Sequence, residues 1–307
     1  METLRQTLER MGALDGAAMA AARARHDRLT KPPGSLGRLE DLAIWLAGVR
    51  GDPIPQVREK VIVVAAADHG VAAAGVSAYP QEVTGQMVLN FLAGGAAVTV
   101  LARHAGARVV VVDAGVAADL PERPDLRRVR LGPGTADFSR GPAMSREQAV
   151  RCLEEGIRLA REEAARGADV VAVGEMGIGN TTAASAVTAA VLGLPPRAVT
   201  GRGTGVTGER FQHKVAVIER ALAVNRPDPS DPLDVLARVG GFEIGLLAGV
   251  MLGAAAERRP VVLDGFITGA AALLACGLAP ALRDFMVAAH RSVEPGHQAI
   301  LDHLGLE

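Results

Sequence analysis

Short apolar runs alternate with longer helix-like stretches along most of this chain. Five apolar runs are predicted to be buried strands: Val61–Ala66, Arg108–Val112, Val170–Val173, Val261–Leu263 and Phe285–Ala289. Helical patterning covers Glu82–Ala105, Ser145–Arg166, Asn180–Leu192, Glu209–Val224, Gly241–Glu257, Phe266–Cys276 and Pro295–Leu304. This alternation is typical of a doubly wound α/β fold. We therefore predict a mostly parallel sheet with flanking helices.

The amino-terminal region has a different pattern. Its first 28 residues place Leu4, Leu8, Met11 and Leu14 at helical spacing among many charges, which predicts an amphipathic helix rather than a secretion signal. A proline-rich turn then precedes a second helical stretch, Arg38–Val49. We expect a small helical domain made from the chain's two ends. The predicted boundaries are 1–58 for its N-terminal part, 59–292 for the large α/β domain, and 293–307 for a C-terminal helix that returns to the small domain.

Composition excludes several classes of function. Apolar residues make up 49% of the 307 residues but aromatics only 3%, so the core must consist of Ala, Val and Leu. With 33 basic and 34 acidic residues there is no electrostatic case for nucleic acid as a partner. Cys152 and Cys276 lie in apolar stretches without metal-ligand spacing, which fits a reducing compartment and no metal site. The apolar tract Gly240–Ala256 contains Glu243 and is too short for a membrane span. We predict a cytoplasmic protein that has no membrane partner.

The most informative motif is a glycine-rich turn, Gly174–Thr182, between a strand and a helix. Its glycines let backbone amides approach a ligand closely, and the helix N-terminus attracts an anion such as phosphate. Glu175 would be repelled by phosphate, so it is better placed to meet sugar hydroxyls or positive charge that develops on a sugar. A turn without any ligand is the alternative interpretation. The residues of this turn match neither a Walker loop nor a dinucleotide-binding fingerprint, so neither ATP hydrolysis nor NAD binding is favoured.

A second glycine-rich loop, residues 200–206, precedes the helix that carries Lys214. The chain holds only two other lysines, Lys31 and Lys60. A flexible cation one to two turns into a helix behind such a loop can reach a phosphate. The ordinary alternative is a solvated surface lysine.

Every predicted strand is followed by an acidic residue: Asp68, Asp113, Glu175, Asp264 and Glu294. The carboxyl ends of parallel strands meet at one sheet edge, where ligands bind in open α/β folds. Asp is also a common turn and cap residue, which explains part of this pattern. The pair Asp68-His69 has no second His or Cys at ligand spacing, so a metal site is not favoured there.

With these residues in view, the sequence resembles the nicotinate-nucleotide:dimethylbenzimidazole phosphoribosyltransferases, which make α-ribazole phosphate for cobalamin assembly. The resemblance covers nearly the whole chain. It is carried by Lys31–Gly37, Ala67–Val71, Tyr79-Pro80 with Val83-Thr84, Gly174–Thr182, Gly201–Gly205, Leu263–Phe266 and Ser292–Gly296.

The resemblance implies a homodimer, no cofactor and a set of site residues. It places the general base on Glu294, and we expect Glu175 and Asp264 to stabilise positive charge on the ribose. The implied phosphoribose contacts are Gly174, Met176, Gly177, Ile178, Gly179, Asn180, Thr181 and Thr182. The implied phosphate contacts are Arg202, Gly203, Thr204, Gly205 and Lys214, and the implied acceptor contacts are Tyr79, Pro80, Met87 and Ser292.

Two departures from the family pattern leave alternatives open. Some members place serine and glutamine where Tyr79 and Met87 stand, so the acceptor base could be another aromatic ring. The family also continues with a further segment beyond residue 306, whereas this sequence stops at Glu307. The competing hypothesis is therefore a non-catalytic paralogue that binds phosphoribosyl ligands.

Overall fold

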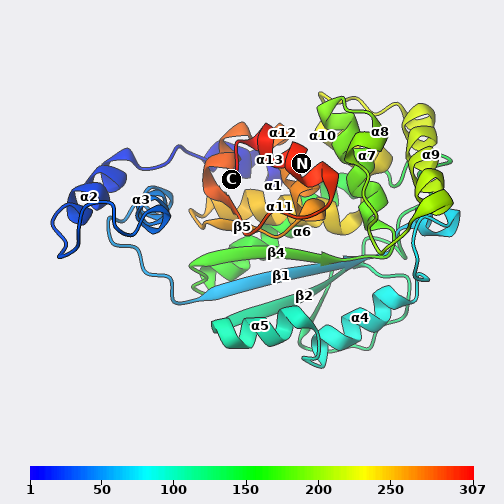
Figure 1. The fold of residues 1–307 in the computed structure, drawn as a ribbon. Helices are drawn as coiled ribbons and strands as arrows, with labels where there is room; N and C mark the ends of the chain where they lie inside the picture. The colour runs from blue at the N-terminus through cyan, green and yellow to red at the C-terminus, as the bar shows by residue number, and fades with distance from the viewer.

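A single six-stranded sheet organises the computed structural model, which describes residues 1–307 (Figure 1). The strands follow the order β3-β2-β1-β4-β5-β6, and every neighbouring pair is parallel. They are β1 (Lys60–Ala67), β2 (Ala107–Gly115), β3 (Leu126–Arg128), β4 (Val170–Met176), β5 (Val261–Leu263) and β6 (Met286–Ala288). The predicted doubly wound parallel sheet is confirmed. The sequence pattern missed β3, because only Leu126 of its three residues is apolar and buried.

Thirteen helices and two short 3-10 turns complete the fold. The helices are α1 (Glu2–Arg10), α2 (Gly16–His26), α3 (Arg38–Arg50), α4 (Val83–Leu92), α5 (Ala97–Ala105), α6 (Arg146–Ala165), α7 (Asn180–Leu192), α8 (Pro196–Val199), α9 (Gly208–Asn225), α10 (Pro232–Val239), α11 (Phe242–Ala256), α12 (Phe266–Leu278) and α13 (Pro295–Leu304). The 3-10 turns are η1 (Gly70–Ala74) and η2 (Pro280–Phe285).

Two predicted helices are each broken into two. The helix predicted for the first 28 residues ends at Arg10, and α2 begins after Asp15, whose side chain accepts a hydrogen bond from Ala18 N. The helix predicted over Glu82–Ala105 stops near Gly94, which has a φ of 77° that favours glycine. In both places local capping overrides a continuous apolar pattern.

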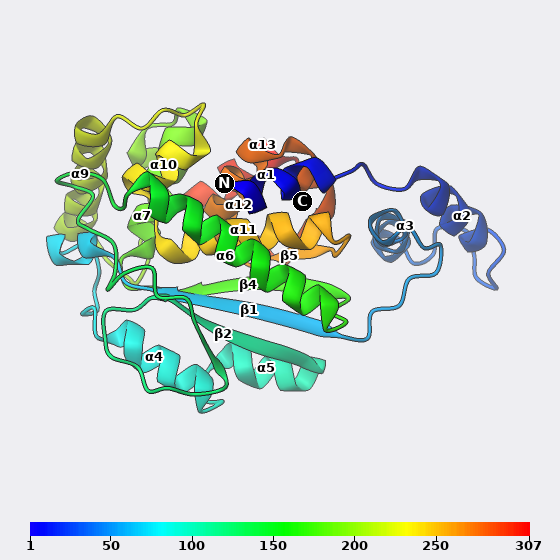
Figure 2. The ribbon, with the colours of Figure 1, turned by 180° about the vertical axis from the view of Figure 1, so that it is seen from behind.

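The two faces of the sheet carry different helical layers. Helices α4 and α5 lie on one face, whereas α6, α11 and α12 cover the other (Figures 1 and 2). By length and composition alone the segment Val83–Ala105 could cross a membrane, with a mean hydropathy of 1.5. It is divided between α4 and α5, and both contact the sheet.

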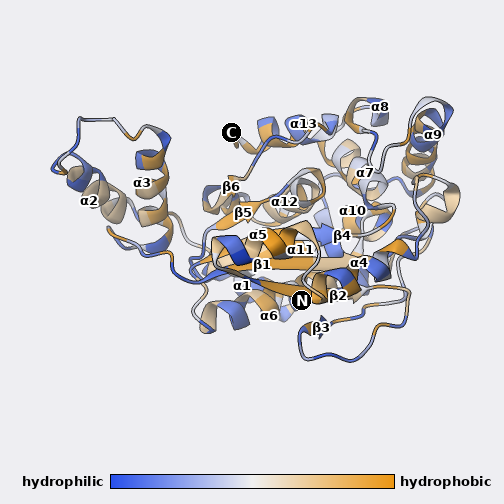
Figure 3. Cartoon of the chain, turned by 60° about the horizontal axis from the view of Figure 1, so that its bottom comes forward, coloured by the Kyte–Doolittle hydropathy of each residue, from blue (hydrophilic) through white to orange (hydrophobic).

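The centre of the core is α11, all 15 residues of which are buried. Glycines allow it to pack very closely on α6: a side chain at Gly156 would collide with the α11 backbone, and one at Gly249 would collide with the α6 backbone. Figure 3 shows the apolar colour concentrated on β1 and α11. The tract predicted to be a buried helix is therefore confirmed as one.

The terminal helices occupy separate places. Helices α2 and α3 pair with each other beyond the amino ends of the strands, whereas α1 packs on α6 and α11 (Figures 1 and 2). Helix α13 packs on α12, α8 and α7, and the last residue reaches α3 through an ion pair between Arg38 and Glu307. The α2–α3 pair is compatible with a small helical domain, and the division at residues 58 and 292 stays a prediction.

Candidate active site

Parallel pairing brings the carboxyl ends of the strands to one edge, but the acidic residues there do different work. Asp113 accepts a hydrogen bond from Val116 N at 2.8 Å, and Asp68 accepts one from Ala117 N at 2.8 Å. Both side chains are buried, and this burial raises the pKa of each carboxyl. These two acids hold the loop after β2, which is the turn role that the sequence left open.

Glu175 lies at the end of β4 and is held from one side. The side-chain amide of Asn180, the first residue of α7, donates a hydrogen bond to Glu175 Oε2. Burial raises the pKa of the Glu175 carboxyl to about 7, and the negative charges of Glu243 and Asp264 add to this effect. Glu175 is therefore a carboxyl that changes its ionisation near neutral pH.

The turn after Glu175 requires glycine for two reasons. Gly179 has a φ of 94°. A side chain at Gly177 would collide with the carbonyl oxygen of Ala67 in β1. The hydroxyl of Thr84 in α4 also accepts a hydrogen bond from Ile178 N at 3.1 Å. The turn is thus fixed against the end of β1 and the start of α4.

Lys214 is a buried cation rather than a surface lysine. Its side chain is 1% exposed, and Nζ donates a hydrogen bond to Thr181 Oγ1 at 2.8 Å. Burial lowers the pKa of Lys214 to about 8, although the Glu294 carboxylate opposes this shift. An added side-chain carbon at Gly203 would lie 2.9 Å from Nζ, so the second glycine-rich loop passes directly over the ammonium group.

Glu294 faces the same loop from the opposite side. It is the N-cap residue of α13, and its Oε1 accepts a hydrogen bond from Gly203 N at 3.0 Å. Its Oε2 is buried without a hydrogen-bond partner. Ser292 supports this placement, because its hydroxyl accepts a hydrogen bond from Glu294 N at 3.1 Å. The fold thus brings residues 181, 203, 214 and 294 together, although they lie far apart in the sequence.

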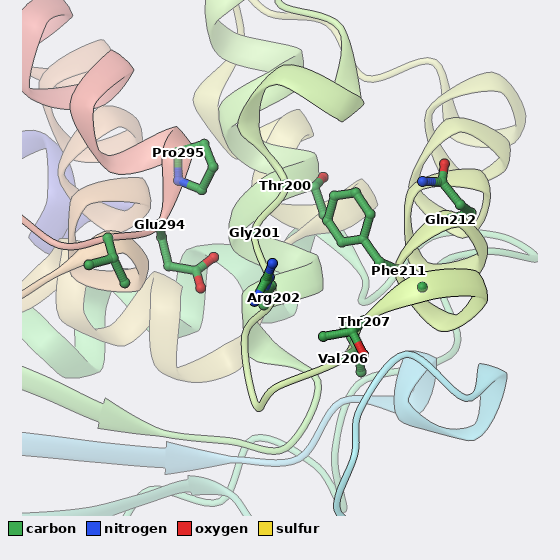
Figure 4. A pocket seen from close by; sticks show the side chains of 11 residues that line it. Thr200, Gly201, Arg202, Val206, Thr207, Phe211, Gln212, Glu294 and Pro295 are labelled. Atoms are coloured by element: carbon green, nitrogen blue, oxygen red, sulfur yellow. The ribbon is translucent and has the colours of Figure 1, made fainter.

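A cavity of about 590 Å³ opens between the Glu294 segment and the start of α9 (Figure 4). In this view the Glu294 carboxyl points toward the loop that carries Gly201 and Arg202. The lining residues are Thr200, Gly201, Arg202, Val206, Thr207, Gly208, Phe211, Gln212, Val293, Glu294 and Pro295. The cavity has a carboxylate on one wall and an apolar ring, that of Phe211, on another.

Several predicted site residues lie outside this cavity. Tyr79 is 57% exposed, and Pro80 is also exposed. Met87 and Met176 pack against an apolar cluster that includes Val88 and Phe91 of α4. Gly174 lies within β4 and borders a groove on the α5 side of the sheet. Of the acceptor contacts that the resemblance implies, only Ser292 stands next to Glu294.

The remaining predicted residues differ in their exposure and in their contacts. Asp264 is exposed, and its Oδ1 lies 3.8 Å from His290 Nδ1. Thr204 reaches across to the loop before α4, where its Oγ1 accepts a hydrogen bond from Ala78 N at 2.9 Å. Arg202 and Gly205 are exposed. Thr182 is buried and its hydroxyl has no partner.

Sequence reasoning missed two parts of the site. Phe211 and Gln212 line the cavity from α9. Their position at the start of the helix that follows the second glycine-rich loop could have identified them as cavity residues. Glu243 forms a buried pair with His69 at 2.7 Å. The single glutamate in an otherwise apolar helix could have indicated that Glu243 has a buried partner. No group of three His, Cys, Asp or Glu side chains is arranged to hold a metal ion.

Comparison with known proteins gives one consistent result. The model of a family described as "Phosphoribosyltransferase" matches residues 11–307. A nicotinate-nucleotide–dimethylbenzimidazole phosphoribosyltransferase of Roseiflexus sp. (strain RS-1) is 61% identical, over 100% of this chain and 87% of the relative. The protein of that name from Geobacter sulfurreducens is 53% identical, over 99% of this chain and 87% of the relative. A crystal structure of the Thermus thermophilus protein of that name matches with a TM-score of 0.90 at 50% identity, covering 96% of this chain and 87% of that one.

Proposed function

Because this chain belongs to the nicotinate-nucleotide:dimethylbenzimidazole phosphoribosyltransferase family, we propose that it transfers phosphoribose from nicotinate mononucleotide to 5,6-dimethylbenzimidazole. The products are α-ribazole 5′-phosphate and nicotinate. The names of the relatives support the assignment of these substrates. The cluster of Glu294, Gly203, Lys214 and Thr181 beside the cavity supports the chemistry.

The reaction needs a base but no general acid. A ring nitrogen of the acceptor attacks C1 of the ribose, and the bond from C1 to the nicotinate nitrogen breaks. The bonding pair leaves with nicotinate, whose cationic ring becomes a neutral pyridine. The acceptor ring becomes cationic and loses the proton on its other nitrogen to Glu294. Glu294 Oε2 is the oxygen that we assign to this proton, because it has no hydrogen-bond partner.

Positive charge on the ribose is stabilised by carboxylates at the strand ends. As the C1–N bond lengthens, the ribose ring becomes cationic, and a preorganised negative charge nearby lowers the barrier. Glu175 at the end of β4 supplies that charge in its ionised form, and Asp264 after β5 adds to the field. Attack opposite the leaving group converts the β-nucleotide into the α-product in one inversion. Isolation of a ribosyl-enzyme adduct would contradict this single displacement.

The phosphate is the group that Lys214 and the second glycine-rich loop bind in our proposal. A buried ammonium with one hydrogen bond, to Thr181, has further donors available for an anion. The first glycine-rich turn adds the amides at the start of α7, where a helix N-terminus favours negative charge. Fixing the phosphate at this point would hold C1 of the ribose at the cavity that Glu294 borders.

The single observation that carries the proposal is the position of Glu294 between the cavity and the loop over Lys214. We expect the wild-type protein, given both substrates, to release free nicotinate and form α-ribazole 5′-phosphate, measured by chromatography. Glu294→Gln should lower kcat by ~10²–10⁴ while nicotinate mononucleotide still binds, because only the proton acceptor is lost. Binding of the nucleotide by a wild-type protein that releases no nicotinate would instead support the non-catalytic paralogue.

The acceptor is tested separately, because Tyr79 and Met87 do not line the cavity. We propose dimethylbenzimidazole as the preferred acceptor from the names of the relatives. A panel that includes adenine and a phenol, with nicotinate release as the common readout, compares the acceptors directly. A higher kcat/KM with another ring would replace dimethylbenzimidazole in the proposal.

We also propose a cytoplasmic homodimer. Parallel sheets are normally covered on both faces, yet a groove of about 400 Å³ lies over β4 and β5 beside α5, with ten hydrophobic residues among the twelve that line it. Exposed Leu101 and Val100 extend this apolar surface on α5. The two cysteines are free, and burial raises the pKa of Cys276 to about 12, which suits inert thiols in a reducing compartment. Light scattering that gives the mass of one chain would exclude the dimer.

A further inference from the structure

A buried ion pair stands directly behind the first glycine-rich turn, outside the groups that the proposed mechanism uses. His69 Nε2 lies 2.7 Å from Glu243 Oε1, and both side chains are fully buried. His69 follows the end of β1, and Glu243 lies in the first turn of α11, where the helix dipole stabilises negative charge. The pair therefore joins the central strand to the most buried helix at the carboxyl edge of the sheet.

Glycines enclose the imidazole on two sides. A side-chain carbon at Gly177 would lie 3.3 Å from His69 Cδ2 and 3.4 Å from Nε2. One at Gly241 would collide with His69 Cε1 and lie 2.7 Å from Glu243 Oε2. The ring is thus pressed between the glycine-rich turn and the residue that caps α11. Movement of the imidazole would move the turn that carries the proposed ribose contacts.

The pair leaves two buried polar atoms without hydrogen-bond partners, His69 Nδ1 and Glu243 Oε2. A pair that served only to fill the core would be better replaced by apolar side chains, because buried ion pairs contribute little net stability. Buried unsatisfied groups in a native fold call for another explanation. The neighbouring carboxyl of Glu175 supplies one.

Charge links the pair to Glu175. Burial opposes protonation of His69, but the charge and hydrogen bond of Glu243, together with the charges of Asp68 and Glu175, outweigh it and raise the pKa of the imidazole, which favours its protonated form. Four groups face Glu175 from four elements: Glu243 on α11, the amide of Asn180 on α7, Asp264 after β5 and His69 after β1. After burial, Glu243 contributes most to raising the pKa of Glu175, whereas Asn180 and His69 lower it. His69 is itself faced by Glu243, Asp68 and Glu175.

We propose that His69 and Glu243 are positioning residues, which fix the Gly177–Gly179 turn and set the ionisation of Glu175 at the ribose. This inference rests on the proposed phosphoribosyl transfer. The imidazolium favours the ionised carboxylate, and the Glu243 carboxylate opposes it. Burial raises the pKa of Glu175 to about 7, Glu243 adds to this rise and His69 limits it, so the carboxyl is close to its midpoint near neutral pH when no donor is bound. The cationic ring of the donor shifts it to the charged form.

Substitution of the two partners should therefore have opposite effects on the pH profile. In His69→Asn the positive charge is lost and Glu243 remains, so the acid limb of kcat/KM should move up, by at most ~1 pH unit. In Glu243→Gln the larger opposing charge is lost, and the buried imidazole loses the carboxylate that contributes most to raising its pKa. Because Glu243 has the greater effect on Glu175, the acid limb should then move down.

If the His69–Glu243 pair only stabilises the fold, a different result is expected. Both substitutions would then lower the melting temperature and leave the midpoint of the acid limb unchanged. Asp113→Asn is the matched control, because Asp113 is a buried carboxyl at the end of β2 that is not among the groups that shift the pKa of Glu175. It should leave the limb in place. Shifts of the acid limb in the same direction for His69→Asn and Glu243→Gln, or no shift, would overturn the proposal.

Two measurements keep the test decisive if a variant does not fold. Nitrogen-15 NMR of the wild-type imidazoles should show His69 losing its second ring proton at a higher pH than free histidine, and an unshifted or lowered titration would overturn the proposal. The pH dependence of nicotinate mononucleotide binding, followed by calorimetry, should show the same opposite shifts without any turnover. A wild-type protein that binds the donor but transfers nothing would contradict the proposed function, while these binding shifts would still support or overturn the positioning role.

Discussion

The two glycine-rich segments of the site are held in contrasting ways. The first turn, around Gly177, is fixed from behind by the interior: the end of β1, the hydroxyl of Thr84 and the His69–Glu243 pair. The second loop, around Gly203, is exposed along much of its length. It is held by groups that belong to the site itself, namely Glu294 and the contact of Thr204 with the loop before α4.

Because of this difference, substitutions in the two segments should have different effects. The first turn keeps its shape as long as the core is packed, so a change there should appear mainly as lost stability. The shape of the second loop depends on the same carboxylate that the proposed chemistry needs, so a change there should appear mainly as lost activity. In the proposed reaction a phosphate entering this loop competes with Glu294 for the Gly203 amide, which would free the carboxylate for the acceptor.

The largest effect on stability is expected for Gly177→Ala in the first turn. The added methyl would collide with the backbone carbonyl of Ala67, which cannot move without disturbing β1. We expect a loss of about 3 kcal/mol in the free energy of unfolding, measured by denaturant titration. Gly174→Ala is the matched control on β4, because its methyl would meet only Val64 Cγ2 at an ordinary 3.8 Å. Equal losses for the two variants would contradict the account of the first turn.

The corresponding change in the second loop is Gly201→Ala. Its methyl would lie 2.5 Å from the carboxyl carbon of Glu294, which is the end of a flexible side chain and can rotate away. The carboxylate would then be misplaced by about 1 Å, so kcat should fall by ~10²-fold, or about 2.7 kcal/mol of barrier. The melting temperature should change little. A destabilised variant with normal kcat would reverse the comparison between the two segments.

Most of the fold was open to prediction from local pattern. Parallel strands buried on both faces are continuous apolar runs, and long helices have a strong period, so β1, β2 and β4 and helices such as α6 were identified. The errors occurred where capping competes with an apolar period, at Gly94 and Asp15. A three-residue strand such as β3 forms because its backbone pairs with β2, and its own residue types do not predict it.

The site was predicted only as far as motifs describe it. Glu175, Asn180, Lys214 and Glu294 were named, and the structure brings Lys214 and Glu294 together over the same loop. The depth of Lys214 could not be read from the sequence, because a lysine on a helix is usually solvated. The pairing of His69 with Glu243 spans 174 positions, and no local pattern encodes such a contact.

A smaller effect is expected from the buried lysine under the second loop. Because burial lowers the pKa of Lys214 to about 8, its positive charge is complete below that pH and is lost as the pH rises through it. In the proposed mechanism the KM for nicotinate mononucleotide should rise by up to about tenfold per pH unit above pH 8. Lys214→Met should bind the nucleotide weakly and show no such dependence between pH 7 and 9.5. A pH-independent KM in the wild-type protein would remove Lys214 from the phosphate site.

The smallest effect should come from Thr204→Val, which tests the outer attachment of the second loop. The hydroxyl accepts a hydrogen bond from Ala78 N at 2.9 Å and lies 3.2 Å from Ser77 Oγ, and both contacts are exposed to solvent. Loss of one such hydrogen bond costs about 1 kcal/mol. We expect this loss as a several-fold rise in the KM for the donor with kcat nearly unchanged, because the loop would close less often while Glu294 keeps its own contact.

Thr207→Val is the matched control, since Thr207 belongs to the same cavity wall and its side chain makes no capping hydrogen bond. A similar rise in KM for both variants would mean that the attachment to the loop before α4 does not hold the second loop in place.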